Sequence, residues 1–231
     1  MPNLNYPTAA SQKVVSIWGE QQSLLDEGGL FGALSPTPGT AIAMTTSVVD
    51  DAATASSTHA QFAPAMIIAN SALASDPSAV SIYPLYLKLL VAQVPTSATQ
   101  WRYALRLDSV ARYSSGGSQL TPVSPNPLST QASKAQVYFG AIVPAALPST
   151  VSRLVASGMV SAAIPTAADY HTWMFGPSTQ THAGSAPFIM TVPAIAIPPG
   201  WSLSLELWGA SNAAAASFEV ELVFAERLPG R

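Results

Sequence analysis

The chain has 231 residues, a net charge of −3 and 9% charged residues, against about 25% in an average globular protein. Such a composition offers no basic footprint for nucleic acid, and the lack of cysteine excludes disulfides, thiolate nucleophiles and cysteine-bound zinc. No stretch has the pattern of a membrane helix or a signal peptide. A surface so short of charge predicts a protein that functions in an assembly, with much of its outside covered.

The first forty residues predict an N-terminal arm. Apolar residues between Ser11 and Gly28 follow the spacing of one short amphipathic helix, with Trp18, Leu24 and Leu25 on its apolar side. The following text, LFGALSPTPGT, is rich in Pro and Gly and predicts a linker or tight turn. Two placements stay open: the arm packs on a neighbouring subunit, or its helix caps its own domain.

Residues 41–231 predict one all-β domain, because short alternating runs recur between Pro, Gly, Ser and Asn without helical segments. Many short strands in one domain indicate a β-sandwich of jelly-roll type. The predicted strands are Ala41–Val49, Phe62–Asn70, Ile82–Val94, Trp101–Tyr113, Ala135–Val143, Val151–Ile164, Tyr170–Phe175, Phe188–Ile197, Trp201–Trp208 and Phe218–Glu226.

The stretch GWSLSLELWGASNAAAASFEVELVFAER, residues 200–227, predicts a hairpin with an uncharged loop. Leucines alternate with Ser202, Ser204 and Glu206 in its first strand, and Glu219 and Glu221 alternate with apolar residues in its second. The three carboxylates are therefore expected on outward faces.

Three interpretations of these carboxylates stay open: a solvated face, ion pairs across strands or subunits, and an acid pair for catalysis. Basic partners are available, because Arg102 and Arg106 share one face of a predicted strand and Lys88 lies in another. A glycosidase would need two carboxylates close together in a cleft.

No catalytic motif is present: the chain has no G-x-S-x-G elbow, no Walker loop and no dinucleotide fingerprint. The histidines His59, His171 and His182 do not form a metal-binding pattern. Trp208 falls out of phase with the leucines of its strand, which indicates an exposed aromatic side chain. We expect no enzyme activity, no cofactor and no metal. The residues expected at intersubunit contacts are Trp18, Leu24, Leu25, Arg102, Arg106, Glu206, Trp208, Glu219 and Glu221.

The texts PTPGTAIA, IYPLYLKLL, ALRLDSVARYSSGGSQLTPVSPNP and residues 200–227 resemble virion proteins of tailed bacteriophages, of the kind that decorate or cement the capsid. The resemblance implies a β-sandwich or jelly-roll unit, commonly a trimer, seated on the capsid lattice. It implies no individual functional residue.

The expected function is that of a capsid decoration protein on the virion surface, with other copies of itself and the major capsid protein as partners. Neither nucleic acid nor a membrane is an expected partner. The alternative is a fibre or tail adhesin that binds a glycan or receptor on the host surface.

Overall fold

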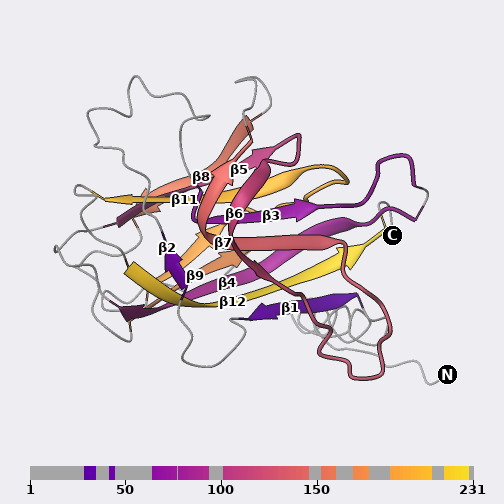
Figure 1. Ribbon diagram of the computed structural model, residues 1–231, viewed down its shortest axis with the longest axis horizontal. Helices are drawn as coiled ribbons and strands as arrows, with labels where there is room; N and C mark the ends of the chain where they lie inside the picture. Colours follow the sequence, from indigo (N-terminus) through magenta and orange to yellow (C-terminus); the bar gives the residue numbers. More distant parts are fainter. Residues whose placement is uncertain are drawn as a thin grey trace, which may run out of the picture.

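The computed structural model describes residues 29–34, 42–44, 64–76, 78–93, 101–145, 152–159, 169–176, 188–209 and 216–228. These residues form strands arranged in two sheets, and the predicted all-β sandwich is confirmed. The predicted helix and its residues Trp18, Leu24 and Leu25 lie outside the described residues. Figure 1 shows β1, β12 and β4 along the lower part of the sandwich and β8, β5, β11 and β3 along the upper part.

Sheet A has the strand order β1-β12-β4-β9-β10, with β2 also paired to β12. All its pairs are antiparallel except β9 with β10. Its strands are β1 (Leu30–Leu34), β2 (Ile42–Met44), β4 (Ser81–Gln93), β9 (Tyr170–Phe175), β10 (Phe188–Val192) and β12 (Ala216–Arg227).

Sheet B has the strand order β6-β7-β3-β11-β5-β8, and all its pairs are antiparallel. Its strands are β3 (Met66–Asn70), β5 (Trp101–Asp108), β6 (Tyr113–Leu120), β7 (Ala135–Pro144), β8 (Ser152–Met159) and β11 (Ser202–Gly209). Successive strands of the chain often lie in different sheets.

The core lies between the two sheets, where alternate residues of each strand point inward. The predicted inward sets are confirmed: the leucines of β11 and Phe218, Val220, Leu222 and Phe224 of β12 are buried in this cluster. Among its largest members are Phe31 of β1 and Phe224 of β12, whose rings stack with centroids 5.8 Å apart.

Every strand predicted from the sequence overlaps an observed one, but two strands were missed. β1 lies in the text predicted to be a linker, and β6, apart from Tyr113, lies between two predicted strands. β1 is strand-like because β12 pairs with it along one side, while Gly32 and Val123 exchange backbone hydrogen bonds of 2.9 and 2.8 Å on the other. Both strands thus depend on partners far away in the sequence.

Two further predictions are wrong. The predicted strand Trp101–Tyr113 is interrupted, because β5 ends at Asp108 and β6 starts at Tyr113. β11 and β12 do not form a hairpin: β11 pairs with β3 and β5 in sheet B, whereas β12 pairs with β1, β2 and β4 in sheet A. The connection between them therefore crosses from one sheet to the other.

Candidate functional site

The outer face of sheet B carries a buried polar network. Ser202, Ser204 and Glu206 of β11 point away from the leucines that fill the core, yet they are 0–1% exposed. The outward direction predicted for Glu206 is therefore correct in phase, but the side chain does not face water. The Glu206 carboxylate must therefore have polar or charged partners, because an unpaired buried carboxylate is strongly unfavourable.

Arg106 and Arg112 supply the compensating charge. Arg106 Nε lies 3.2 Å from Glu206 Oε2, and Arg112 Nη1 lies 3.1 Å from Glu206 Oε1. Arg112 Nη1 also lies 3.8 Å from Asp108 Oδ2. Two guanidinium groups thus face two carboxylates, so the cluster carries no net charge. It is an ion pair across strands of one chain, one of the three interpretations left open by the sequence.

The corner between β5 and β6 places Arg112 in this network. The Arg112 backbone N–H donates to Ser202 Oγ at 3.1 Å, and Ser202 Oγ in turn donates to the Val110 carbonyl at 2.8 Å. The Ala145 N–H donates to the Arg112 carbonyl at 2.6 Å. These bonds fix the corner on sheet B, so Arg112 is fully buried although it lies outside any strand.

A second, more exposed cluster lies on the outer face of sheet A. Glu221 accepts a hydrogen bond from the Tyr86 hydroxyl, and Lys88 Nζ lies 3.5 Å from Glu221 Oε2. Lys88 also lies 5.5 Å from the ring centroid of Tyr170, within cation–π range. Burial, together with Glu221, raises the pKa of Tyr86. Glu219 is half-buried on the same strand face, opposite Leu90.

The predicted interface residues are therefore divided between two surfaces. Arg102 is exposed on β5, and the backbone of Trp208 pairs with it in sheet B, whereas the Trp208 side chain lies outside the described residues. Glu206 lies on the outer face of sheet B, while Glu219 and Glu221 lie on the outer face of sheet A. Two sheets, roughly 10 Å apart, separate them, so Glu206 and Glu219 do not form the close acid pair of a glycosidase.

Asp108 and Arg112 were missed as members of the buried network. The sequence carries one signal for them, because an Asp and an Arg four residues apart flank the corner text SVA in a chain with few charges. Arg112 contacts Glu206 and Asp108 contacts Ser204, and these pairs of residues are 94 and 96 positions apart in the sequence.

His171 lies on the inner face of sheet A. It pairs with the buried Leu89 of β4 and is 2% exposed. Burial lowers the pKa of His171 to about 4, and the nearby Asp169 opposes this shift only in part. The ring is therefore neutral at neutral pH and packs as part of the core.

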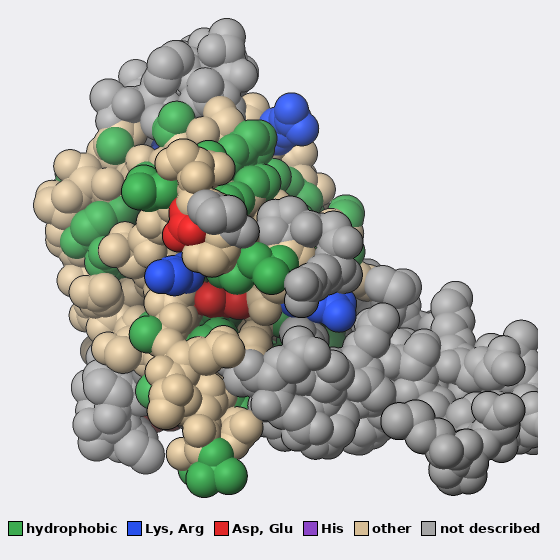
Figure 2. Space-filling model, turned by 90° about the vertical axis from the view of Figure 1, so that its right-hand side faces the viewer, with side chains coloured by type: hydrophobic (Ala, Val, Ile, Leu, Met, Phe, Trp, Pro, Cys, Tyr) green, Lys and Arg blue, Asp and Glu red, His purple; other side chains and the backbone are tan. Residues whose placement is uncertain are grey.

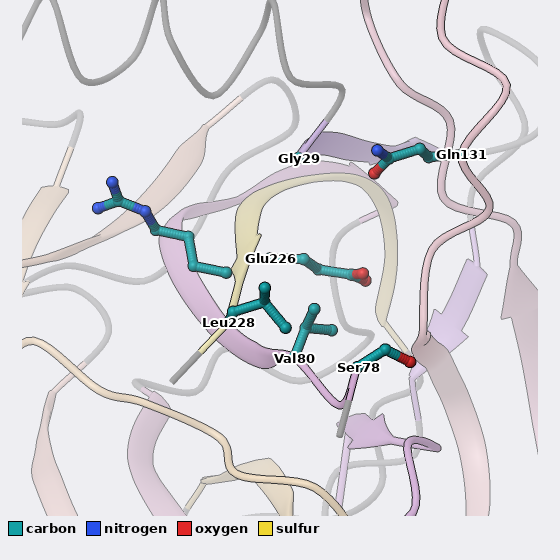
Figure 3. Close-up of a pocket in the computed structure, with 7 residues that line it drawn as sticks. Gly29, Ser78, Val80, Gln131, Glu226 and Leu228 are labelled. Carbon is teal, nitrogen blue, oxygen red and sulfur yellow. The ribbon is translucent and has the colours of Figure 1, made fainter. Parts of the chain in front are cut away.

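A pocket opens at the end of the sandwich where β1 begins and β12 ends. It has a volume of about 570 Å³ and includes Gly29, Ser78, Val80, Gln131, Glu226 and Leu228 in its lining. Figure 3 shows the Glu226 carboxylate directed into the space between Gln131 and Ser78. Figure 2 views this end of the molecule, where acidic and basic side chains gather within a surface of hydrophobic and uncharged ones.

Comparison of the chain with protein-family models, curated proteins and solved structures finds no match. Within the described ranges, no group of three or more His, Cys, Asp or Glu side chains is placed to hold a metal ion. None of the described segments forms a helix of the length and hydrophobicity needed to cross a membrane.

Proposed function

We propose that the protein is a structural component of a phage virion, a capsid decoration or cement protein that works as a homo-oligomer of jelly-roll subunits. The observation that carries this proposal is the nesting of strand pairs. β1 pairs with β12, β3 with β11, β4 with β9 and β5 with β8, as in a long hairpin that has been rolled up. Nested pairing of this kind supports the jelly-roll part of the proposal, and jelly rolls recur in viral capsid and lectin domains.

The positions of the charged side chains also favour a structural role. The cluster joins Glu206, Asp108 and Arg112, which are buried, with Arg106, which is partly exposed, so its charges are paired within the fold. Among the described side chains on the outer face of sheet A, the charged residues include the pair Lys88 and Glu221 together with Glu219, and Tyr86 and Tyr170 lie beside the pair. A face of this composition suits contact with another protein, because few charges must be stripped of water.

A cement protein stabilises the capsid by binding to it. A protein that binds the assembled lattice, and not its separate subunits, stabilises the lattice by mass action. The sequence resemblance to decoration proteins agrees with this proposal.

The test uses phage particles that lack this protein. We expect them to release DNA at a lower temperature than intact particles, and purified protein added back should restore the difference. Sedimentation of the purified protein measures whether it forms the expected trimer. Equal heat resistance of both kinds of particle would refute the cement role.

The second candidate is a virion adhesin. It is favoured by Tyr86 and Tyr170, which lie on one open sheet face with Lys88 between them, and tyrosines of this kind stack on sugar rings. If the protein is an adhesin, phage particles that lack it should keep their heat resistance and lose adsorption to the host. Substitution Tyr170→Ala would lower adsorption, whereas Leu154→Ala, an exposed residue of β8, would leave it unchanged.

A further inference from the structure

The pocket at the end of the sandwich is built from parts of the chain that are distant in sequence. Gly29 precedes β1, Ser78 and Val80 precede β4, Gln131 lies between β6 and β7, and Glu226 ends β12. The Glu226 N–H donates to the Gly29 carbonyl at 2.8 Å, which closes one wall. Its volume of about 570 Å³ lies within the range of small-molecule sites in proteins.

Glu226 is held in a fixed direction by one of its two oxygens. Oε1 accepts hydrogen bonds from the Ser133 hydroxyl at 2.5 Å, the Lys134 N–H at 2.8 Å and the Ala135 N–H at 3.2 Å. In the part of the chain that the structure describes, Oε2 accepts none. An ionised carboxylate accepts about four hydrogen bonds, so this group still has accepting capacity, directed into the pocket (Figure 3).

The remaining lining combines donors with an apolar wall. Gln131 provides side-chain N–H donors, while Val80 and Leu228 provide hydrocarbon surface. Among the described residues near the pocket, Asp76 and Glu226 are matched in charge by Lys134 and Arg227. A strongly cationic or anionic ligand would therefore gain little from this environment.

We infer that this pocket binds a neutral saccharide unit, with Glu226 accepting hydrogen bonds from its hydroxyl groups. A sugar presents several hydroxyls that both donate and accept, and its C–H face suits the wall formed by Val80 and Leu228. Burial raises the pKa of Glu226 in spite of its three hydrogen bonds, and a hydroxyl donated to Oε2 would favour the ionised form. The inference goes beyond the proposed capsid role, which needs no ligand here.

The experiment is an NMR titration of the full chain with four sugars: glucose, galactose, rhamnose and N-acetylglucosamine. The backbone amides of Lys134 and Ala135 report on the site, because both donate to Glu226 Oε1. We expect saturable shifts of these amides with at least one sugar, at a Kd of about 1 mM, which corresponds to about −4 kcal/mol.

Three variants locate the binding. Gln131→Trp fills the pocket from an exposed position whose side chain makes no hydrogen bond in the described structure, so the fold should persist and the shifts should vanish. Glu226→Gln keeps an acceptor at Oε1 but replaces Oε2 by a donor, and should weaken binding about tenfold, as expected for one charge-assisted hydrogen bond. The control Leu154→Ala changes an exposed residue of β8 that does not line the pocket, and it should leave binding unchanged.

Saturable shifts that vanish in Gln131→Trp support the site even if Glu226→Gln does not fold. Three results overturn it: no saturable shift with any of the four sugars, equal shifts in Gln131→Trp, or shifts of these amides with methylguanidinium alone. Because loss of the sugar site leaves capsid heat resistance untouched, failure here is distinguishable from failure of the cement role.

Discussion

Arg112 and Glu206 lie 3.1 Å apart, from Nη1 to Oε1, and both side chains are removed from water on the outer face of sheet B. A buried ion pair seldom adds much net stability, but removal of one partner leaves the other charge uncompensated. This pair joins the corner between β5 and β6 to β11, so the corner and the strand depend on each other.

Arg112→Met should therefore lower the free energy of unfolding by about 3–5 kcal/mol, as for other broken buried pairs. Urea denaturation measures the loss. The double variant Arg112→Met with Glu206→Met removes one charge of each sign, so it should regain part of the stability. A double variant less stable than Arg112→Met alone would contradict the charge argument.

The matched control is the exposed pair Lys88 and Glu221, whose side chains are 39% and 36% exposed. Lys88→Met should change stability by less than about 1 kcal/mol, because water and salt screen such pairs. Equal losses for Lys88→Met and Arg112→Met would mean that burial does not set the cost.

His171 should make stability depend on pH. Its pKa is about 4 in the folded chain and 6.5 when unperturbed, so the unfolded state binds the extra proton between these values. The contribution is complete above pH 6.5 and is lost as the pH falls toward 4. The slope should approach about 1.4 kcal/mol per pH unit, roughly 3 kcal/mol across the window.

The check is urea denaturation of the wild type and His171→Leu at several pH values from neutral to 4. Carboxylates titrate in both proteins, so the difference between the two slopes isolates His171. Parallel curves would show that the ring is not buried as a neutral group.

Gly116 should not tolerate a side chain. Its φ is +75°, and a Cβ there would lie 2.5 Å from the carbonyl oxygen of Ala141 on β7. Gly116→Ala should cost roughly 3 kcal/mol, from backbone strain together with the clash. Gly200 has a similar φ of +77° but open space around the Cβ position, so Gly200→Ala should cost only about 1 kcal/mol. Thermal or urea unfolding measures the loss of stability in each variant. Equal losses would show that the close contact between β6 and β7 does not add to the cost at Gly116.

β1 should be an integral strand of the sandwich. Phe31 is 1% exposed and stacks on Phe224, so Phe31→Ala should cost about 3–5 kcal/mol by opening a cavity in the core. Leu73, which is 71% exposed, is the control, and Leu73→Ala should stay within about 0.5 kcal/mol of the wild type. A small effect of Phe31→Ala, measured by urea denaturation, would return this segment to the arm predicted from the sequence.

Prediction from sequence succeeded where period-two alternation is strong. The leucines of β11 and the alternating apolar residues of β12 were placed in the core because apolar residues that share one strand face are expected to be buried together. It failed at β1, which lies beside Pro- and Gly-rich text, and at β6, whose Gly and Ser residues give no local strand signal. β6 is a strand because β7 pairs with it, with register shifts at its glycine-rich part.

The charged residues show the same division. Alternation in β11 correctly opposed Glu206 to the leucines, but exposure does not follow from phase, since a corner of the chain covers that face with Arg112. The pocket at Glu226 was not predicted at all, because its lining comes from segments as distant as Gly29 and Leu228.

The sequence by itself determined that the protein is all-β, that it has few charges to show to water, and which residues of its strongest strands face the core. These properties follow from local periodicity and composition. Only the tertiary structure decided that β11 and β12 belong to different sheets, that Glu206 is buried with two arginines, and that Glu226 faces a pocket. The reason is physical, because hydrogen bonds between strands and the pairing of buried charges join residues far apart in the chain. A local sequence pattern does not predict which distant residue each of them contacts.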